Sequence, residues 1–396
     1  MTTATMETAT GTGALLEVYK RSGPVFVGGS GCTLLAEDGR AYLDFTSGIA
    51  VNALGYASPV FGDAIRAALE AGLVHTSNLF HTRPAAELAE WLAAHSFADR
   101  VFFCNSGAEA NEGAIKFARR WAGAHGGEHK TEIVAFKGGF HGRTMGALAA
   151  TDRPAYQAPF RPLMPGVRFG TIGDVAEADR LIRPERTAAV IVEPIQAEGG
   201  IMAVPPAFLK ALRYLCDEAG ALLIFDEVQV GLGRTGTLFA HEQAGVTPDL
   251  MTLAKPLAGG LPMGAVLMTE RVAAAIQPGD HATTFGGGPL VASAALATVK
   301  TIGDEAFLAE VRRKGELLGG LLQSLAVRRE KVKEVRGAGL IWGVQVEGSA
   351  GEVVARALEA GLLLCTAGPD VVRIVPPLVI GDGEIARGVD LLDEVL

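Results

Sequence analysis

The stretch GALLIFDEVQ, residues 220–229, joins an apolar run to a pair of acids. The run Ala221–Phe225 lacks the polar alternation of a half-exposed strand, which predicts a strand buried on both faces of a sheet. Asp226 would then stand at the carboxyl end of that strand, where open α/β sheets bind their ligands. The stretch therefore predicts both a fold class and the edge of the sheet at which a site should form.

Four further apolar runs share this pattern, at Val101–Asn105, Ile133–Phe136, Ala189–Val192 and Ala265–Thr269. Helix-like segments lie among them, at Ala108–Ala122, Pro206–Ala219 and Pro289–Ile302. Strands that alternate with helices predict an α/β fold, with a three-layer α/β/α domain around a mostly parallel sheet.

The two ends of the chain have a different pattern. Residues 14–60 contain short Gly-rich strands, and the segments after residue 302 are an amphipathic helix (Glu305–Leu325), two strands (near Leu340–Val346 and Val371–Val375) and a helix from Asp382. We therefore expect a large domain over residues 61–302 and a small α+β domain built from residues 14–60 and 303–396.

Composition narrows the classes of function. The chain has 396 residues and a net charge of −9, which argues against nucleic acid or an anionic membrane surface as partners. Its four cysteines form no CxxC pair, so structural zinc and a disulfide framework are disfavoured and a cytoplasmic location is expected. Residues 1–13 lack the basic start and apolar run of a secretory signal, and we expect a frayed tail there.

Lys255 lies in DLMTLAKPLAGGLPMGA, a weakly charged segment with a rigid Pro256 beside it. A desolvated lysine loses proton affinity and becomes an amine nucleophile suited to Schiff-base chemistry. The buried Asp226 needs a cationic partner, and the protonated pyridine nitrogen of a cofactor is one such cation. Taken alone, Asp226 is equally consistent with a helix cap or an ordinary strand-end acid.

A turn from strand to helix occurs in FFCNSGAEANEGAIKFARRW. The small residues Ser106, Gly107 and Ala108 would let backbone N–H groups and the helix dipole face an anion such as phosphate. A capping box of Ser106 with Glu109 is compatible with this, because it uses neighbouring donors. The absence of GxxxxGK[ST] disfavours a P-loop NTPase, and the absence of GxGxxG after an early strand disfavours a Rossmann dehydrogenase.

The segment FKGGFHGRTMGALAAT places an aromatic ring, an imidazole and a guanidinium close together. Phe140 suits stacking on a flat ring, and Arg143 suits a bidentate grip on a carboxylate. A Gly-rich loop with a surface arginine would explain the segment as well.

Taken together, these segments resemble the class III aminotransferases of fold type I, which depend on pyridoxal 5'-phosphate, and among them most closely the acetylornithine aminotransferases. The resemblance runs from about Tyr19 to Pro377. It rests on YLDFTSGIAVNALG, NSGAEANEGAIKFAR, FHGRT, VEPIQAEGG, FDEVQVGLGRTG, LAKPLAGGLPMGA, TFGGGPL and VRIVPPL.

The resemblance implies a role for each matching residue toward the cofactor. Lys255 would bind it covalently and then move the substrate proton, Asp226 would keep its pyridine nitrogen protonated, and Gln229 would bond its phenolic oxygen. The phosphate would lie on Ser106, Gly107 and Ala108, and Phe140 would cover one ring face. Thr284 would reach the phosphate of a neighbouring subunit, which implies a homodimer with a shared active site.

The resemblance also implies how two unlike amines use one site. Glu198 would neutralise Arg373 while a side-chain amine reacts, and would release Arg373 to bind the α-carboxylate of glutamate. Arg143, together with Tyr19, would hold the distal carboxylate of either substrate. Three departures from the family pattern stand near these groups, at Ala197, Val230 and Gly288.

The expected reaction is that of N-acetylornithine with 2-oxoglutarate, in arginine biosynthesis. Amino-blocked lysine, free or on a carrier protein, ornithine and 4-aminobutyrate remain alternative substrates for the same residues. A glutamate-semialdehyde type of aminomutase and a catalytically silent binding protein are alternatives of other classes. Retention of both Lys255 and Asp226 argues against the silent protein.

Overall fold

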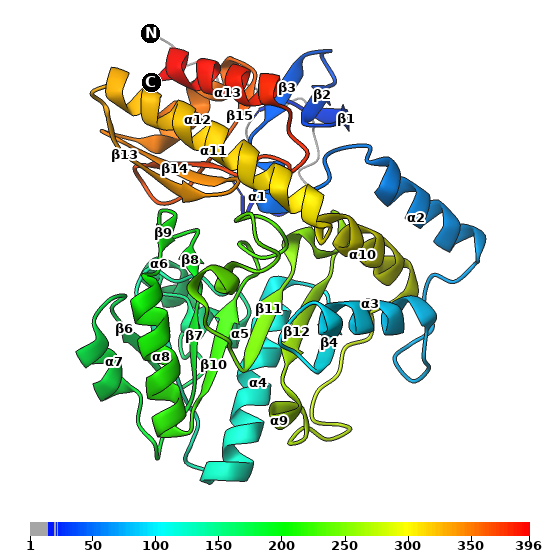
Figure 1. Ribbon diagram of the computed structural model, residues 1–396, viewed down its shortest axis with the longest axis vertical. Coiled ribbons are helices and arrows are strands. Elements are labelled where there is room, and N and C mark those ends of the chain that lie inside the picture. The colour runs from blue at the N-terminus through cyan, green and yellow to red at the C-terminus, as the bar shows by residue number, and fades with distance from the viewer. Residues whose placement is uncertain (1–14, 20, 22) are drawn as a thin grey trace.

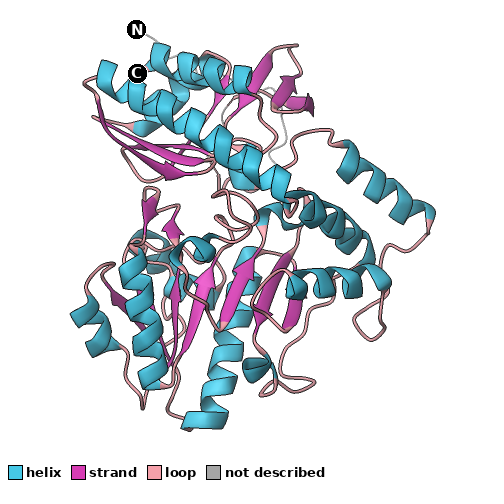
Figure 2. Ribbon diagram, in the orientation of Figure 1, coloured by secondary structure: helices cyan, strands magenta, loops and turns pink. Residues whose placement is uncertain are grey.

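A seven-stranded sheet forms the centre of the lower half of the molecule in the computed structural model, which describes residues 15–19, 21 and 23–396 (Figures 1 and 2). The tail predicted for residues 1–13 lies outside the described residues. In spatial order the strands are β4 (Arg100–Cys104), β12 (Gly264–Met268), β11 (Leu250–Leu253), β10 (Leu222–Asp226), β7 (Thr187–Val192), β5 (Glu132–Phe136) and β6 (Val167–Gly170). All neighbours run parallel except β12, which is antiparallel to both β11 and β4, so the predicted mostly parallel sheet is confirmed.

Helices cover both faces of this sheet, as Figure 2 shows. α4 (Gly107–Gly126) packs on one face of β7, in one core cluster with Ala189 and Ile191. α8 (Pro206–Ala219) packs on the other face, in a core cluster with Val190 and Val192 of the same strand. Successive side chains of a strand point to opposite faces, so a strand whose two faces are both covered by helices must be apolar throughout. This requirement explains the unbroken apolar runs of the sequence.

Each of the five apolar runs forms a strand at nearly the predicted place. α8 and α10 (Pro289–Ile302) have the bounds that the sequence predicts, because each begins with a proline, whose missing N–H costs nothing at the first helical position. β6 and α7 (Val175–Leu181) were not predicted. β6 lies at the edge of the sheet, where exposed Arg168 interrupts the apolar pattern.

Segments from both ends of the chain combine in the upper half of Figure 1. One sheet contains three antiparallel strands from the N-terminal end, β1 (Phe26–Ser30), β2 (Thr33–Ala36) and β3 (Ala41–Asp44). Its fourth strand, β15 (Leu362–Leu363), comes from the C-terminal end and pairs in parallel with β3. A second sheet contains β13 (Val332–Ala338), β14 (Ile341–Val346), β17 (Val371–Ile374) and β16 (Cys365–Thr366), and the helices are α11 (Glu305–Arg328), α12 (Ala350–Glu359) and α13 (Asp382–Val395). The pairing of β3 with β15 supports a small domain made of both ends, and we propose its limits near residues 60 and 302.

The remaining elements are short or lie at the periphery. They are α1 (Ser47–Ala50), α2 (Pro59–Glu70), α3 (Arg83–Ala94), α5 (Met145–Ala150), α6 (Pro154–Gln157), α9 (Glu270–Ala273), β8 (Ile195–Gln196) and β9 (Met202–Ala203). α2 packs beside α10, projects from the body in Figure 1 and buries none of its residues. In the part of the chain that the structure describes, no helix has the length and apolar character needed to cross a membrane.

Candidate active site

An open pocket of about 420 Å³ lies at the carboxyl ends of the central strands. Parallel neighbours such as β10 and β11 end at the same edge of the sheet, so residues that follow them meet there. Of the residues predicted for the site, eight line this pocket: Ser106, Gly107, Ala108, Phe140, Arg143, Asp226, Gln229 and Lys255. The structure thus brings both predicted catalytic residues, Lys255 and Asp226, to one cavity.

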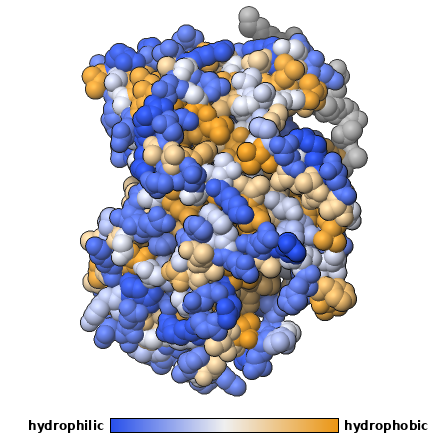
Figure 3. Space-filling model, turned by 45° about the vertical axis from the view of Figure 1, so that its right-hand side comes forward, coloured by the Kyte–Doolittle hydropathy of each residue, from blue (hydrophilic) through white to orange (hydrophobic). Residues whose placement is uncertain are grey.

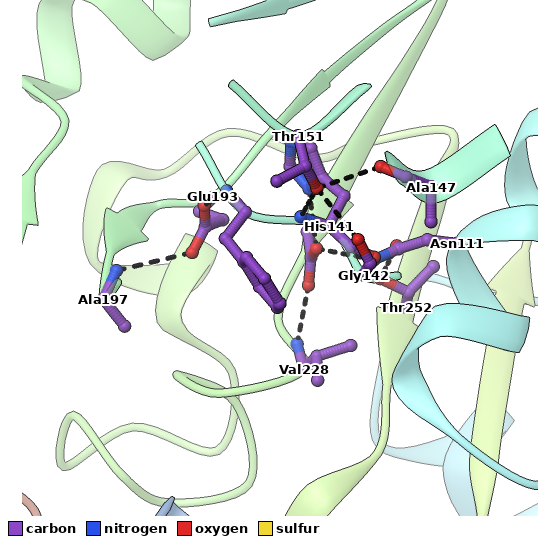
Figure 4. A network of polar contacts seen from close by, with 11 residues as sticks. Asn111, His141, Gly142, Ala147, Thr151, Glu193, Ala197, Val228 and Thr252 are labelled. Carbon is purple, nitrogen blue, oxygen red and sulfur yellow. Dashed lines mark hydrogen bonds and ion pairs between the residues drawn. The ribbon is translucent and has the colours of Figure 1, made fainter. Parts of the chain in front are cut away.

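Asp226 is buried and held by three donors. Asn111 Nδ2 donates to its Oδ2 at 2.7 Å, the same oxygen lies 2.8 Å from Nδ1 of His141, and Val228 N donates to Oδ1 at 3.0 Å (Figure 4). Burial lowers the pKa of His141, but the hydrogen bond and the charge of Asp226 outweigh this effect and raise that pKa. The charge of Asp226 therefore has a buried partner, which reduces the cost of its desolvation.

Further hydrogen bonds fix the partners of Asp226. Thr252 Oγ1 donates to Asn111 Oδ1 at 2.8 Å, and His141 N donates to Thr151 Oγ1 at 2.8 Å. Figure 4 shows these residues converging from separate segments. Neither Asn111 nor His141 was predicted for the site, although both stand in segments that were. A network whose polar members all have partners holds one geometry, so Asp226 is preorganised.

Lys255 begins a 3₁₀ turn (Lys255–Ala258) that follows β11. Its φ of +39° lies in the left-handed region that non-glycine residues seldom occupy. Burial and, to a smaller extent, the positive charge of Arg373 lower the pKa of Lys255 to about 8, against the opposing charge of Glu198. A lysine with this pKa has a substantial neutral fraction near physiological pH, as an amine nucleophile requires.

Glu193, which sequence reasoning missed, lines the same pocket. It follows β7 directly and is 6% exposed, and its carboxylate accepts the N–H groups of Phe140 at 2.8 Å and Ala197 at 3.3 Å (Figure 4). Burial raises the pKa of Glu193 to about 7, with Asp226 adding to the rise and His141 opposing it. A signal was present, because Glu193 stands at the end of a predicted buried strand just as Asp226 does.

The start of α4 forms an anion cradle. Ser106 is the N-cap, and its Oγ accepts the N–H of Glu109 at 3.2 Å. The Glu109 carboxylate bonds the N–H of Asn105 at 2.8 Å, so the predicted reciprocal bond of the capping box falls one residue earlier than expected. A Cβ on Gly107 would lie 2.6 Å from Val228 Cγ1, so only glycine leaves this side of the pocket unobstructed. Its amide group can then approach a phosphate closely.

Arg373 and Glu198 form an ion pair beside the pocket rather than in its lining. Arg373 is 2% exposed, and it also donates from Nη1 to Gln229 Oε1 at 3.0 Å and from Nε to Cys365 Sγ at 3.3 Å. Burial acts to raise the pKa of Glu198, but the charge and hydrogen bond of Arg373 outweigh it and lower that pKa. Gln229, which lines the pocket, thus connects it to the Arg373–Glu198 pair, the predicted switch between the two substrates.

Two predicted residues do not reach the pocket of this single chain. Tyr19 is 71% exposed, and its ring contacts the guanidinium of Arg21 at 5.6 Å. Thr284 is exposed on the loop that precedes α10. Their predicted roles stay predictions.

The sequence profile of the family described as "Aminotransferase class-III" matches residues 19–396. This chain belongs to the class-III aminotransferases. It is 52% identical over 388 residues to a protein of Alnus glutinosa named "Acetylornithine aminotransferase, mitochondrial", a match that covers 96% of this chain and 85% of the relative.

Solved structures of class-III aminotransferases share its fold. The ornithine aminotransferase of Toxoplasma gondii superposes with a TM-score of 0.91 at 30% identity, covering 96% of this chain and 92% of the other. The N-acetylornithine aminotransferase of Stenotrophomonas maltophilia superposes with a TM-score of 0.83 at 38% identity, covering 95% and 96%. These likenesses confirm the predicted fold and family.

Class-III aminotransferases use pyridoxal 5'-phosphate, and the residues of this pocket fit it. An anionic phosphate suits the N-terminus of α4, where a Cβ at position 107 would clash with Val228 of the pocket lining. A protonated pyridine nitrogen suits the buried Asp226 carboxylate. Phe140 and Val228 offer apolar walls to a flat ring, and Lys255 supplies the amine.

Proposed function

We propose that this class-III aminotransferase acts on N-acetylornithine and 2-oxoglutarate, forming N-acetylglutamate semialdehyde and glutamate, as a step of arginine biosynthesis. The observation that carries the proposal is the ion pair of Arg373 with Glu198, joined through Gln229 to the pocket that holds Lys255 and Asp226. A charge pair that can open and close beside the reacting carbon suits an enzyme that accepts two unlike amines. The name of the Alnus glutinosa relative supports the choice of substrate.

Lys255 and Asp226 would have distinct tasks in the exchange. When bound, pyridoxal phosphate supplies an electron sink that stabilises negative charge at the substrate carbon. Lys255 would hold the cofactor and, once freed by substrate, its Nζ would take the proton from the carbon that bears the amine and later return it. Asp226, fixed by Asn111 and His141, would stabilise the protonated pyridine nitrogen.

The other pocket residues would position the cofactor. Ser106, Gly107 and Ala108 would bind the phosphate at the start of α4. Gln229 would hydrogen-bond the phenolic oxygen, and Phe140 would cover one face of the ring and exclude water. These contacts fix the reacting carbon relative to Lys255, which favours reaction by orientation.

The switch would work by exchanging one carboxylate for another. With acetylornithine bound, a methylene lies next to the reacting carbon, and Glu198 keeps Arg373 neutralised. With glutamate bound, its α-carboxylate takes the place of Glu198 on Arg373. A buried arginine left without a partner would be strongly disfavoured, so one carboxylate has to be present in each state.

Arg143 would bind the distal carboxylate that both substrates carry. Among the described residues, Arg143 forms no ion pair and no hydrogen bond, and it lines the pocket. Its guanidinium edges are therefore available for a bidentate contact. A substrate carried on an acidic protein would call for a basic rim at the pocket mouth, but Arg143 and Lys255 are the arginine and lysine of the described lining.

Single-turnover spectroscopy of the cofactor-loaded protein tests the substrate proposal. N-acetylornithine, ornithine, N-acetyllysine and 4-aminobutyrate are compared as amine donors, each followed by 2-oxoglutarate. We expect N-acetylornithine to react with the highest kcat/KM and 2-oxoglutarate to restore the starting spectrum. A higher kcat/KM for another amine would refute the proposed substrate. Turnover of glutamate semialdehyde without 2-oxoglutarate would indicate an aminomutase.

We also propose a cytoplasmic homodimer whose partner subunit completes the site through Thr284. The loop of Thr284 carries Phe285, 66% exposed, and the nearby Leu79 and Phe80 are 87% and 71% exposed. Figure 3, in which the right-hand side of Figure 1 comes forward, shows hydrophobic surface in several places among the hydrophilic surface of that face. Apolar side chains gathered in this way suit burial by a second copy.

Sedimentation and subunit mixing test the dimer. We expect a dimer in solution and, for Thr284→Ala, weaker binding of pyridoxal phosphate. Lys255→Ala and Thr284→Ala subunits are then mixed. A mixed dimer has one site with both residues intact only if Thr284 acts across the interface, so mixing should restore cofactor affinity to the site that contains Lys255. A stable monomer with full activity would contradict the proposal.

A further inference from the structure

Tyr156 lies directly against the guanidinium of Arg143. The guanidinium carbon is 3.5 Å from the centroid of the Tyr156 ring and 5.9 Å from that of Phe140. At the shorter distance the positive charge faces the electron-rich face of the ring, which attracts it. This contact occupies the face of the guanidinium and leaves its N–H edges free.

The segment that carries Tyr156 is itself fixed. Arg153 donates to the carbonyl of Glu198 at 3.0 Å, and Gln157 donates to the carbonyl of Thr151 at 2.9 Å. Tyr156 N bonds the carbonyl of Arg153 at 2.9 Å, within the short helix α6. Hydrogen bonds therefore fix the backbone that carries the Tyr156 ring, although 39% of the residue is exposed.

We propose that Tyr156 is a positioning residue that, through Arg143, sets the preference of this enzyme for substrates with a distal carboxylate. The inference rests on the proposed function, because it concerns the carboxylate that Arg143 would bind. A free arginine side chain samples many rotamers, and this freedom is lost when it binds. A ring that holds the guanidinium face-on removes part of that cost before the substrate arrives.

The same segment contacts the opposite end of the site. Arg153 holds the carbonyl of Glu198, the residue that pairs with Arg373, while Tyr156 holds Arg143. One segment of six residues, 152–157, therefore contacts Arg143 at one end of the site and the backbone of Glu198, the partner of Arg373, at the other. Loss of the Tyr156 ring should disturb only the Arg143 end, because the Arg153 contact does not involve that ring.

The experiment compares glutamate with norvaline, an amine donor of the same chain length that lacks the distal carboxylate. Half-reaction rates are measured for the cofactor-loaded parent, Tyr156→Leu and Tyr156→Phe. For Tyr156→Leu we expect kcat/KM with glutamate to fall about 5- to 30-fold, mainly through KM, the range for losing a partly desolvated cation–π contact. The rate with norvaline should change less than about twofold, and Tyr156→Phe, which keeps an aromatic face, should restore the glutamate value.

Two controls separate this role from a general effect on folding. Tyr214→Leu removes a tyrosine that is 63% exposed on α8, outside the pocket lining, and should change neither rate. In an Arg143→Leu background, Tyr156→Leu should cause no further loss with glutamate, because the two residues would act as one unit. If Tyr156→Leu does not fold, Tyr156→Gln replaces it under the same criteria.

Equal losses with glutamate and norvaline, or a full additional loss in the Arg143→Leu background, would overturn the proposal for Tyr156 alone. A parent protein that does not react with glutamate would overturn the proposed function, and this inference with it. Selective loss with glutamate, restored by Tyr156→Phe, supports both.

Discussion

Glu193 directly follows β7, Asp226 is the last residue of the neighbouring parallel strand β10, and both residues line one pocket. The sheet register pairs the residues just before them, Val192 and Phe225. Within the described residues, Asp226 has side-chain partners in addition to a backbone donor, whereas Glu193 accepts only from backbone N–H groups. When two like charges share a buried site, the less stabilised group holds its proton. We therefore expect Glu193, the less stabilised carboxylate of this pair, to hold a proton.

The pH dependence of stability tests this relationship. The raised pKa of Glu193, about 7, lies above the ordinary carboxyl value of the unfolded chain. Between those two values the folded protein binds a proton that the unfolded chain releases, so this residue lowers stability as pH rises through the window. Glu193→Gln should raise the Tm at about pH 8 relative to the Tm at about pH 5 by a few degrees, compared with the parent. An unchanged difference between the two Tm values would show that Glu193 is ionised throughout.

Lys255→Ala should abolish transamination, lowering kcat by at least about 1,000-fold, because the variant lacks the amine that holds the cofactor and moves the proton. The parent should be yellow with bound pyridoxal phosphate, and the variant should lose the absorption of the covalent adduct. Lys210→Ala, which removes an exposed lysine of α8, is the control and should keep both properties. A colourless parent with full activity would refute the cofactor.

The rate at which cofactor-free protein captures pyridoxal phosphate should rise with pH and level off above about 8, the pKa of Lys255. Only the neutral amine reacts, so the rate follows its deprotonated fraction. Arg373→Gln should move the midpoint to higher pH, because it removes a positive charge that lowers this pKa. Glu198→Gln should move it to lower pH, and a shift in the same direction for both variants would contradict the electrostatic assignment.

Glu198→Ala should change the balance between the two half-reactions. Without Glu198 the positive charge of Arg373 stays unpaired when acetylornithine binds, whereas glutamate still neutralises it. We expect the acetylornithine half-reaction to slow about 10-fold or more relative to the glutamate half-reaction, since an unpaired buried charge costs several kcal/mol. Single-turnover rates with each donor measure the ratio. Equal slowing of both half-reactions would contradict the proposed exchange of carboxylate partners on Arg373.

Arg143→Lys should raise KM for acetylornithine and for glutamate about 10-fold while changing kcat little. A lysine ammonium keeps the charge but not the planar fork that binds a carboxylate through two hydrogen bonds. Initial-rate kinetics with both donors give the two constants. Unchanged constants would show that Arg143 does not contact the distal carboxylate.

The sequence by itself determined the buried strands of the central sheet and the local parts of the site, but not the edge strand β6. Strands covered on both faces must be apolar throughout, so β5, β7 and β10 were predictable from their composition. The strand-to-helix turn at Ser106–Ala108, where we propose that phosphate binds, was predictable as well, because a strand, small residues and a helix are consecutive in the chain. The family resemblance implied that Lys255 and Asp226 act on one cofactor, and the structure brings both to one pocket.

Only the tertiary structure decided the contacts between segments far apart in the chain. Asn111 and His141 reach Asp226 from other elements, Tyr156 supports Arg143, and Gln229 links Arg373 to the pocket. No periodicity or spacing encodes these contacts, because they depend on how helices and loops pack over the edge of the sheet. Hydrophobic pattern and turn chemistry act within a few residues, whereas the direction of a buried polar side chain is set by whichever partner the fold brings within hydrogen-bonding distance.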